Sequence, residues 1–296
     1  MNPFVVSVPA AVIATGGVAA YGAVYPRAQL FGPTICRTNS PRKLAITFDD
    51  GPNPATTPKL LDLLDRHQAK ATFFVIGRFV RQCPELVRET AAHGHVIGNH
   101  TATHPNLLWL SPSQISRELR ACHEAISEAA GAAPKWFRPP YGFRNPWVIP
   151  AAAALGCQTA MWTLIPGDWR EKPAEWLIAR MEPIAANARR NANNKKQIPR
   201  ASLPQAGKAA LGMTTEESTT KAFPQTHSGL PQKAGPTTGA GGAGDILCLH
   251  DGYHRQQNYD RTRTLAALEH WLPRWRDLGL EFVTMDDAVR TPGAGA

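Results

Sequence analysis

The chain has 296 residues, 43% hydrophobic and 19% charged, a length and balance that predict one large globular domain or two small ones. Much of the formal net charge of +9 lies in residues 187–240, where eight Lys and Arg and two Glu give +6. That segment has a single aromatic residue, Phe223, for stacking on bases, so we expect no nucleic-acid binding. The five cysteines form no Cys-x-x-Cys pair, which argues against a disulfide framework and a cysteine-built zinc site.

The first 26 residues carry no charged side chain, and residues 4–25 are mostly apolar. About 20 such residues can cross a bilayer as a helix, so we expect a retained membrane anchor. A cleaved signal peptide and a soluble apolar arm are the alternatives. We expect a membrane-associated protein on the extracytoplasmic side, in the cell envelope. The basic residues that follow the segment are Arg27, Arg37, Arg42 and Lys43. By the positive-inside rule they argue for the opposite side of the membrane, so sidedness stays open.

From Lys43 onward, short β-prone runs alternate with helical patterns. This alternation predicts an α/β fold, a distorted (β/α) barrel of about seven parallel strands with helices outside. The expected strands are 43–48, 71–76, 95–98, 135–137, 157–164, 245–250 and 281–285. The expected helices are 57–67, 79–93, 113–130, 146–155, 174–190 and 262–278. Active sites of such barrels lie at the carboxyl ends of the strands.

Residues 191–244 interrupt this pattern, since they are rich in Asn, Lys, Pro, Thr and Gly and poor in large apolar residues. A structureless loop of this length is improbable inside a compact domain. We therefore expect a disordered, low-complexity insertion without a catalytic role, within a domain that spans 43–290.

Two adjacent carboxylates, Asp49 and Asp50, end the first predicted strand. Successive strand residues point to opposite sides, so the two are not expected to do the same job. At the end of a strand, one can hold a metal ion while the other handles a proton. A solvated Asx turn is the alternative.

Two histidines, His100 and His104, follow the third predicted strand. One helical turn would bring both imidazoles to the same face, a reasonable spacing for a zinc pair. Asp50 would supply a third ligand and leave the fourth position to water. Taken alone, the pair also fits a chance occurrence.

Further polar motifs follow the fourth and sixth predicted strands. Arg138-Pro-Pro-Tyr-Gly142 combines a rigid backbone, suited to aiming an N–H at an oxyanion, with a guanidinium that can orient a carboxylate through a bidentate pair. His250 ends its strand, where it suits a general acid, and Leu249 could line a small apolar pocket. A proline-rich connector and a histidine that closes a strand are the plain alternatives.

In order and spacing, these motifs resemble those of the polysaccharide deacetylase family. This is the fourth carbohydrate esterase family, which includes the NodB homology domain and the chitin and peptidoglycan deacetylases. The resemblance covers residues 43–289 without the insertion and implies a barrel of the NodB homology type. It rests on Thr47-Phe-Asp-Asp-Gly51, His100-x-x-x-His104, Arg138-Pro-Pro-Tyr-Gly142 and Leu249-His250.

The resemblance also implies a role for each matching residue. Asp50, His100 and His104 would hold one divalent metal ion, most often zinc. Asp49, fixed by Arg138, would be the base that deprotonates the metal-bound water, and His250 would protonate the leaving amine. The backbone N–H of Tyr141 would stabilise the oxyanion. The expected substrate contacts are Pro140, Tyr141, Trp169 and Leu249.

One motif departs from the family pattern. After the fifth strand the chain reads Trp162-Thr-Leu-Ile-Pro-Gly-Asp-Trp169, so Ile165 stands where the family has its first acid. An acid in this loop normally tunes the catalytic histidine. Either Asp168 does this alone, or activity is reduced, or the substrate differs. Trp162 and Trp169 are either stacking platforms for substrate or core residues, and we favour Trp169 as a pocket wall.

The motifs together predict a metal-dependent hydrolase that removes N-acetyl groups from the amino sugars of a polysaccharide or oligosaccharide. One alternative is a hydrolase of another non-peptide amide on the same scaffold. The other is a carbohydrate-binding protein with little turnover. The expected partners are an N-acetylated glycan and, through the N-terminal segment, a membrane.

Overall fold

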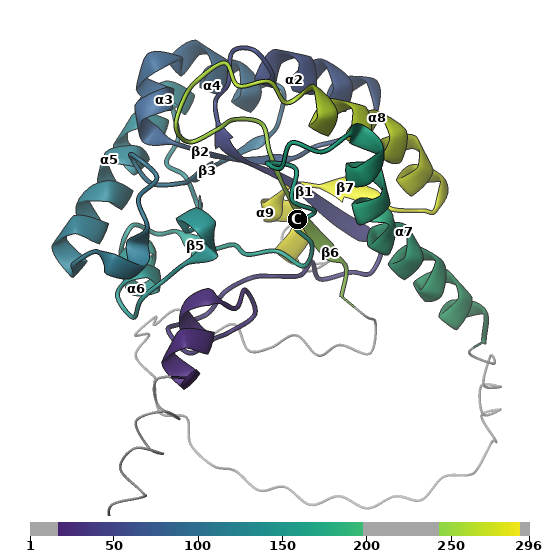
Figure 1. The fold of residues 1–296 in the computed structure, drawn as a ribbon, viewed down its shortest axis with the longest axis horizontal. Helices are drawn as coiled ribbons and strands as arrows, with labels where there is room; N and C mark the ends of the chain where they lie inside the picture. The colour runs from purple at the N-terminus through teal and green to yellow at the C-terminus, as the bar shows by residue number, and fades with distance from the viewer. Residues whose placement is uncertain (1–16, 198–242, 291–296) are drawn as a thin grey trace, which may run out of the picture.

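The computed structural model describes residues 17–197 and 243–290. Within these residues, parallel strands form a curled sheet in the order β5-β4-β3-β2-β1-β6 (Figure 1), and β7 pairs with the first residues of β1. The strands are β1 (Lys43–Gly51), β2 (Thr72–Val75), β3 (Val96–Asn99), β4 (Trp136–Phe137), β5 (Gln158–Thr159), β6 (Asp245–His250) and β7 (Glu281–Val283). The predicted α/β barrel is thereby confirmed.

Helices surround the outside of this sheet (Figure 1), as the predicted alternation of strands and helices requires. Neighbouring helices contact one another in the spatial order α7, α8, α2, α4, α5 and α6. The α-helices are α2 (Thr57–Arg66), α3 (Gly77–Gln82), α4 (Pro84–Ala92), α5 (Pro112–Ala130), α6 (Val148–Ala154), α7 (Ala174–Gln197), α8 (Thr262–Asp277) and α9 (Met285–Val289). Two short 3₁₀ helices, η1 (Leu107–Trp109) and η2 (Pro140–Gly142), lie in the loops after β3 and β4.

Several predicted boundaries were wrong for local reasons. The predicted helix 79–93 is two helices, because Cys83 leaves the helical region and Pro84 starts a new helix. The predicted strand 157–164 pairs as a strand only at residues 158–159. Beyond them, single bridges join Ala160 to Ile35 and Leu164 to Leu247, so this stretch connects β5 to β6 without a regular ladder.

The proposed insertion begins later than residue 191, because α7 continues to Gln197. The rest of it, residues 198–242, lies outside the described residues. Residues 1–16 of the predicted membrane anchor also lie outside them. In the part of the chain that the structure describes, no helix has the length and apolarity needed to cross a bilayer.

Residues 17–35 pack beside the carboxyl end of the sheet. A helix covers residues 17–24, and Ile35 extends the sheet beyond β5 by bonding to Thr159 and Met161. The buried Arg144 guanidinium donates to the carbonyls of Tyr25 and Ala28 and also to that of Gly142. The N-terminal segment is therefore attached to the loop that follows β4.

Strand β1 is buried on both faces, as expected for the centre of a parallel sheet. Leu44, Ile46 and Phe48 join the main apolar cluster beneath the helices. The alternate residues face the interior of the curled sheet, where Ala45 packs in a second cluster and Thr47 accepts a hydrogen bond from a buried arginine. Asp49 continues this inward-facing series at the end of the strand.

Candidate active site

Asp49 and Asp50 border the same cavity. Strict alternation would send Asp50 to the opposite face, but the pairing of β1 with β2 shifts register between Asp49 and Gly51, and Asp50 has a φ of 74°. Such a bulge re-aims one side chain of a strand. Both carboxylates are almost fully buried, at 4% exposure each.

His100 and His104 also lie together, with ring centroids 4.9 Å apart. The predicted helical turn between them was wrong. Residues 100–106 form a loop in which Thr101 and His104 have φ of 70° and 62°. The Thr101 hydroxyl accepts the N–H of His104 at 3.0 Å, and the Asn99 side chain accepts that of Thr101 at 2.9 Å. Side-chain bonds therefore replace the helical ones.

The donor atoms of Asp50, His100 and His104 converge in a way that fits a divalent metal ion. Asp50 Oδ1 lies 3.7 Å from Nε2 of His100 and 3.3 Å from Nε2 of His104. This oxygen is buried, and no residue that the structure describes forms a hydrogen bond with it. One carboxylate and two imidazoles are a donor set used by catalytic zinc sites.

The protonation states suit metal binding, which requires ionised carboxylates and neutral imidazoles. Burial lowers the pKa of His104 to about 3 and also lowers the pKa of His100. Burial alone would raise the pKa of Asp50, but a hydrogen bond from His254 and the neighbouring imidazoles hold it well below its usual range. The backbone carbonyl of Arg138 accepts Nδ1–H of His100 at 2.7 Å, which leaves its Nε2 as the ligand atom.

A second group of potential donors, Asp49, Cys248 and His250, lies on the same side of the cavity. Most donor atoms of this group already contact one another or a neighbouring residue. Arg138 donates to one Asp49 oxygen at 2.7 Å, and the Cys248 thiol contacts the other at 3.3 Å. The group formed by Asp50, His100 and His104 therefore fits a metal ion better than this second group does.

Arg138 is fully buried and fixes Asp49, although not through the bidentate pair that the sequence predicts. A single guanidinium nitrogen bonds Asp49 and also donates to Thr47 at 2.7 Å. The remaining N–H groups donate to the carbonyls of Ala160 and Met161 on the residues that join β5 to β6. The arginine thus ties three parts of the sheet to one carboxylate.

His250 contacts Asp168, the acid that the loop after β5 retains although Ile165 replaces the first motif acid. Asp168 accepts both the backbone N–H and Nδ1–H of His250, each at 2.8 Å. Burial lowers the pKa of this imidazole, but the charge and hydrogen bond of Asp168 outweigh that effect and raise the pKa to about 9. Ile165 lines the cavity as an apolar wall instead.

The Arg138-Pro-Pro-Tyr-Gly motif forms η2, in which Tyr141 has a φ of 58°. The N–H of Tyr141 has no backbone acceptor among the described residues, so it is available to a ligand. A Cβ on Gly142 would overlap the Trp162 ring, so only glycine fits there. Tyr141 lines the cavity, whereas Pro140, which was expected to contact the substrate, is buried and does not line it.

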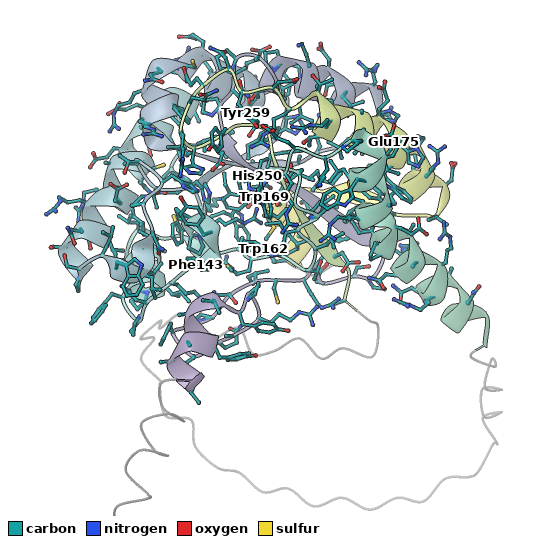
Figure 2. The ribbon with its side chains drawn as sticks, viewed as in Figure 1. Phe143, Trp162, Trp169, Glu175, His250 and Tyr259 are labelled. Atoms are coloured by element: carbon teal, nitrogen blue, oxygen red, sulfur yellow. The ribbon has the colours of Figure 1, made fainter. Side chains whose placement is uncertain are left out.

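The cavity has a volume of about 540 Å³ and brings together most of the residues expected from the sequence. Figure 2 shows Trp162, Trp169 and His250 near the centre of the ring of helices, with Tyr259 closer to the helices at the top of the view. The Trp169 ring meets His250 edge-on at 5.3 Å and is 42% exposed, which supports its expected place on the pocket wall. Leu249 was expected to line the pocket but packs in the main apolar cluster, because its side chain points to the opposite face from that of His250.

Other residues of the cavity were not singled out from the sequence. They are Glu171, Tyr253, His254, Tyr259 and Arg261. Most come from the loop between β6 and α8, whose position depends on contacts distant in sequence. The Asn53 side chain donates to the carbonyls of Asp251 and Tyr259, each at 2.8 Å. The only sequence signal was a second histidine four residues after His250.

Comparisons with known proteins find relatives of similar sequence and fold. Residues 37–160 match the family model described as Polysaccharide deacetylase. A peptidoglycan-N-acetylglucosamine deacetylase of Bacillus cereus is 31% identical over 252 residues, 85% of this chain and 90% of that protein. A chitooligosaccharide deacetylase of Bradyrhizobium sp. is 40% identical over 139 residues, 47% of this chain but only 64% of that protein.

A solved structure is similar over a comparable span. It is a peptidoglycan N-acetylglucosamine deacetylase in complex with 4-naphthalen-1-yl-N-oxidanyl-benzamide, with a TM-score of 0.61 at 26% identity. The similarity covers 87% of this chain and 92% of that one. Because the Bacillus cereus relative matches most of both chains, this chain belongs to the polysaccharide deacetylase family, hydrolases of carbon–nitrogen bonds other than peptide bonds.

Proposed function

We propose that the protein is a metal-dependent N-deacetylase that converts N-acetylated amino sugars of a glycan polymer or oligomer into free amines and acetate. The observation that carries this proposal is the convergence of the Asp50, His100 and His104 donor atoms beside Asp49 and His250 in one cavity. The relatives' names support the substrate class, since one acts on chitooligosaccharide and the other on peptidoglycan N-acetylglucosamine.

Asp50, His100 and His104 would hold a divalent ion, and one carboxylate with two imidazoles is a donor set of catalytic zinc sites. When bound there, it supplies a Lewis acid that polarises the acetamide carbonyl and acidifies water. The neutral imidazoles and the ionised carboxylate leave these atoms ready to coordinate without first losing a proton.

The remaining chemistry belongs to the protein's own residues. Asp49 takes a proton from the attacking water, and the Arg138 guanidinium holds its carboxylate in place through a hydrogen bond at 2.7 Å. The water oxygen bonds to the carbonyl carbon, and the N–H of Tyr141 stabilises the oxyanion that forms. The carbon–nitrogen bond then breaks as His250 gives its proton to the departing amine.

The walls of the cavity suit a sugar ring, which has apolar faces and polar edges. Trp162, Trp169, Ile165 and Tyr141 provide apolar surface in the cavity wall, and the Trp169 ring packs edge-on against His250. The volume of about 540 Å³ lies within the usual range of ligand pockets, roughly 300–1,000 Å³. An amino sugar could therefore stack on the tryptophans while its acetamide reaches the donor atoms.

Incubation with N-acetylglucosamine oligomers should release acetate, and chelation of the metal should abolish that release. Addition of zinc should restore it, because the three donor atoms stay in place without the ion. An acetate assay across chitin-like and peptidoglycan oligomers measures this directly. Glycan binding without acetate release would instead support a carbohydrate-binding protein, and release that no chelator reduces would remove metal dependence.

Two single substitutions should separate the base from the metal ligands. Asp49→Asn should keep stoichiometric zinc but lose turnover by about 10²- to 10⁴-fold, the usual contribution of a general base. His100→Ala should lose the zinc itself, because it removes one of three ligands. Metal content by mass spectrometry and acetate release together distinguish the two. Full activity of Asp49→Asn would eliminate its assignment as the base.

The pH profile should depend on Asp168. Activity requires protonated His250, so it should persist below the pKa of about 9 and fall as pH rises through that value. Asp168→Asn removes the charge that raises this pKa and should move the alkaline limb of kcat/KM toward 6.5, the ordinary value for histidine. At pH 8 the loss should be about tenfold or more, since each pKa unit is a factor of ten.

Glu175→Gln, an exposed acid on the first turn of α7, is the matched control and should leave the profile unchanged. If the alkaline limb of Asp168→Asn coincided with that of the wild type, Asp168 would not be the group that raises the pKa of His250.

We further propose that the protein is membrane-associated and faces the cell envelope. The charge-free residues 1–26 support association, and glycan substrates of the relatives' kind support the extracytoplasmic side. Carbonate washing of membranes from cells that express the full chain should leave the protein in the pellet, and protease added to intact spheroplasts should digest it. Recovery in the soluble fraction, or protection from protease, would contradict the respective half of this proposal.

A further inference from the structure

His254 lies in the active-site cavity without a part in the chemistry proposed above. It follows the end of β6 by four residues and belongs to the loop that leads to α8. Its side chain is 20% exposed. Its contacts reach two of the three metal-binding residues and the tyrosine of η2.

The first contact is with the outer oxygen of Asp50. The backbone N–H of His254 donates to Asp50 Oδ2 at 3.3 Å, and Nδ1 of its ring lies 3.7 Å from the same oxygen. The other oxygen, Oδ1, is the one that faces His100 and His104. His254 therefore holds the carboxylate from behind, with Oδ1 directed at the imidazoles.

The second contact is with His104. The His254 ring stacks on it with centroids 4.4 Å apart and an interplanar angle of 21°, and the Tyr141 ring packs edge-on against His104 at 4.7 Å. A metal-binding histidine usually donates its second ring N–H to a protein acceptor, as His100 does to the Arg138 carbonyl. Nδ1 of His104 has no such partner among the described residues, so ring packing must orient this imidazole.

The third contact closes this cluster of rings. The Tyr141 hydroxyl and Nε2 of His254 lie 3.3 Å apart, within hydrogen-bond distance, and join the loop after β4 to the loop after β6. The backbone of His254 is fixed separately, because Arg78 donates to its carbonyl and Arg261 donates to that of Gly252. A Cβ on Gly252 would overlap the carbonyl oxygen of Asp50, which shows how closely this loop approaches β1.

We propose that His254 is a positioning residue of the metal site, whose ring takes the place of the missing hydrogen bond to Nδ1 of His104. By stacking on His104 and bonding Tyr141, the ring holds the second imidazole in its coordinating orientation. The inference rests on the metal site of the proposed function. It assigns His254 no ligand bond, because its Nδ1 approaches the outer oxygen of Asp50 and the ring lies face to face with His104.

Zinc affinity measured by competition with a chromophoric chelator tests this directly, on the full chain and without substrate. His254→Ala removes the stacked ring and should weaken zinc binding about 10- to 100-fold, as loss of an orienting partner typically does. His254→Phe restores the ring without its nitrogens and should recover most of that loss. His270→Gln, a histidine of α8 outside the cavity, is the matched control and should bind as the wild type does.

Cobalt substitution then separates positioning from coordination. At saturating cobalt, His254→Ala should show the visible absorption spectrum of the wild type, because the same three residues bind the ion. If the spectrum of His254→Ala indicated a different coordination number for the cobalt ion, His254 would be a direct ligand and the proposal would be overturned. If His254→Ala does not fold by circular dichroism, His254→Gln replaces it and should also bind zinc at least tenfold more weakly than His254→Phe.

The outcomes also separate this inference from the function itself. A wild-type chain that binds neither zinc nor cobalt would refute the metal site and, with it, the proposed function. A wild type that binds zinc tightly, with an Ala variant within twofold of it, would refute the role of His254 alone.

Discussion

At Asp50 the backbone of β1 bulges with a φ of 74°, and two adjacent carboxylates therefore reach one cavity. In a regular strand the second would point into the apolar cluster beneath the helices, where an ionised group without a partner is strongly disfavoured. The bulge instead places Asp50 against two imidazoles while Asp49 remains beside Arg138. The proposed roles of Asp49 as base and Asp50 as metal ligand both depend on this bulge.

Backbone strain concentrates around the same point. Six non-glycine residues in the described chain have positive φ, and five of them border the cavity or lie in its loops: Asp50, Thr101, His104, Tyr141 and Asn258. Each such residue costs on the order of 1–3 kcal/mol and persists only when its surroundings hold it in place. Here the Thr101 hydroxyl, the prolines of η2 and the loop of His254 do so. The site is thus maintained by contacts between loops, and no single element builds it.

Three buried carboxylates of the site, Asp49, Asp50 and Asp168, have different partners, and this separates their chemistry. Asp49 faces a guanidinium, Asp50 faces neutral imidazoles, and Asp168 faces an imidazole whose pKa it raises to about 9. Similar groups in different surroundings can thus act as base, ligand and acid-supporting residue at one pH. Although Ile165 stands in the place of a motif acid, Asp168 alone accepts both N–H groups of His250.

The alternation of strands and helices was predictable because it follows from local periodicity. The position of the motif residues was predictable because active sites of barrels lie at the carboxyl ends of the strands. What the sequence could not reveal was geometry set by distant contacts. The bulge at Asp50, the loop that replaces a helical turn at His100, and the inward position of His254 all depend on partners more than a hundred residues away or on positive φ. Leu249 was misplaced because its neighbour His250 takes the inward face.

Diffraction from crystals grown with zinc, recorded on both sides of the zinc absorption edge, tests the central claim most directly. We expect one anomalous peak within coordinating distance of Asp50 Oδ1 and of Nε2 of both His100 and His104, with neither Asp49 nor His250 bound to it. A peak at Asp49, Cys248 and His250 instead would contradict the proposed metal site. The absence of any peak in the cavity of crystals grown in saturating zinc would contradict it as well.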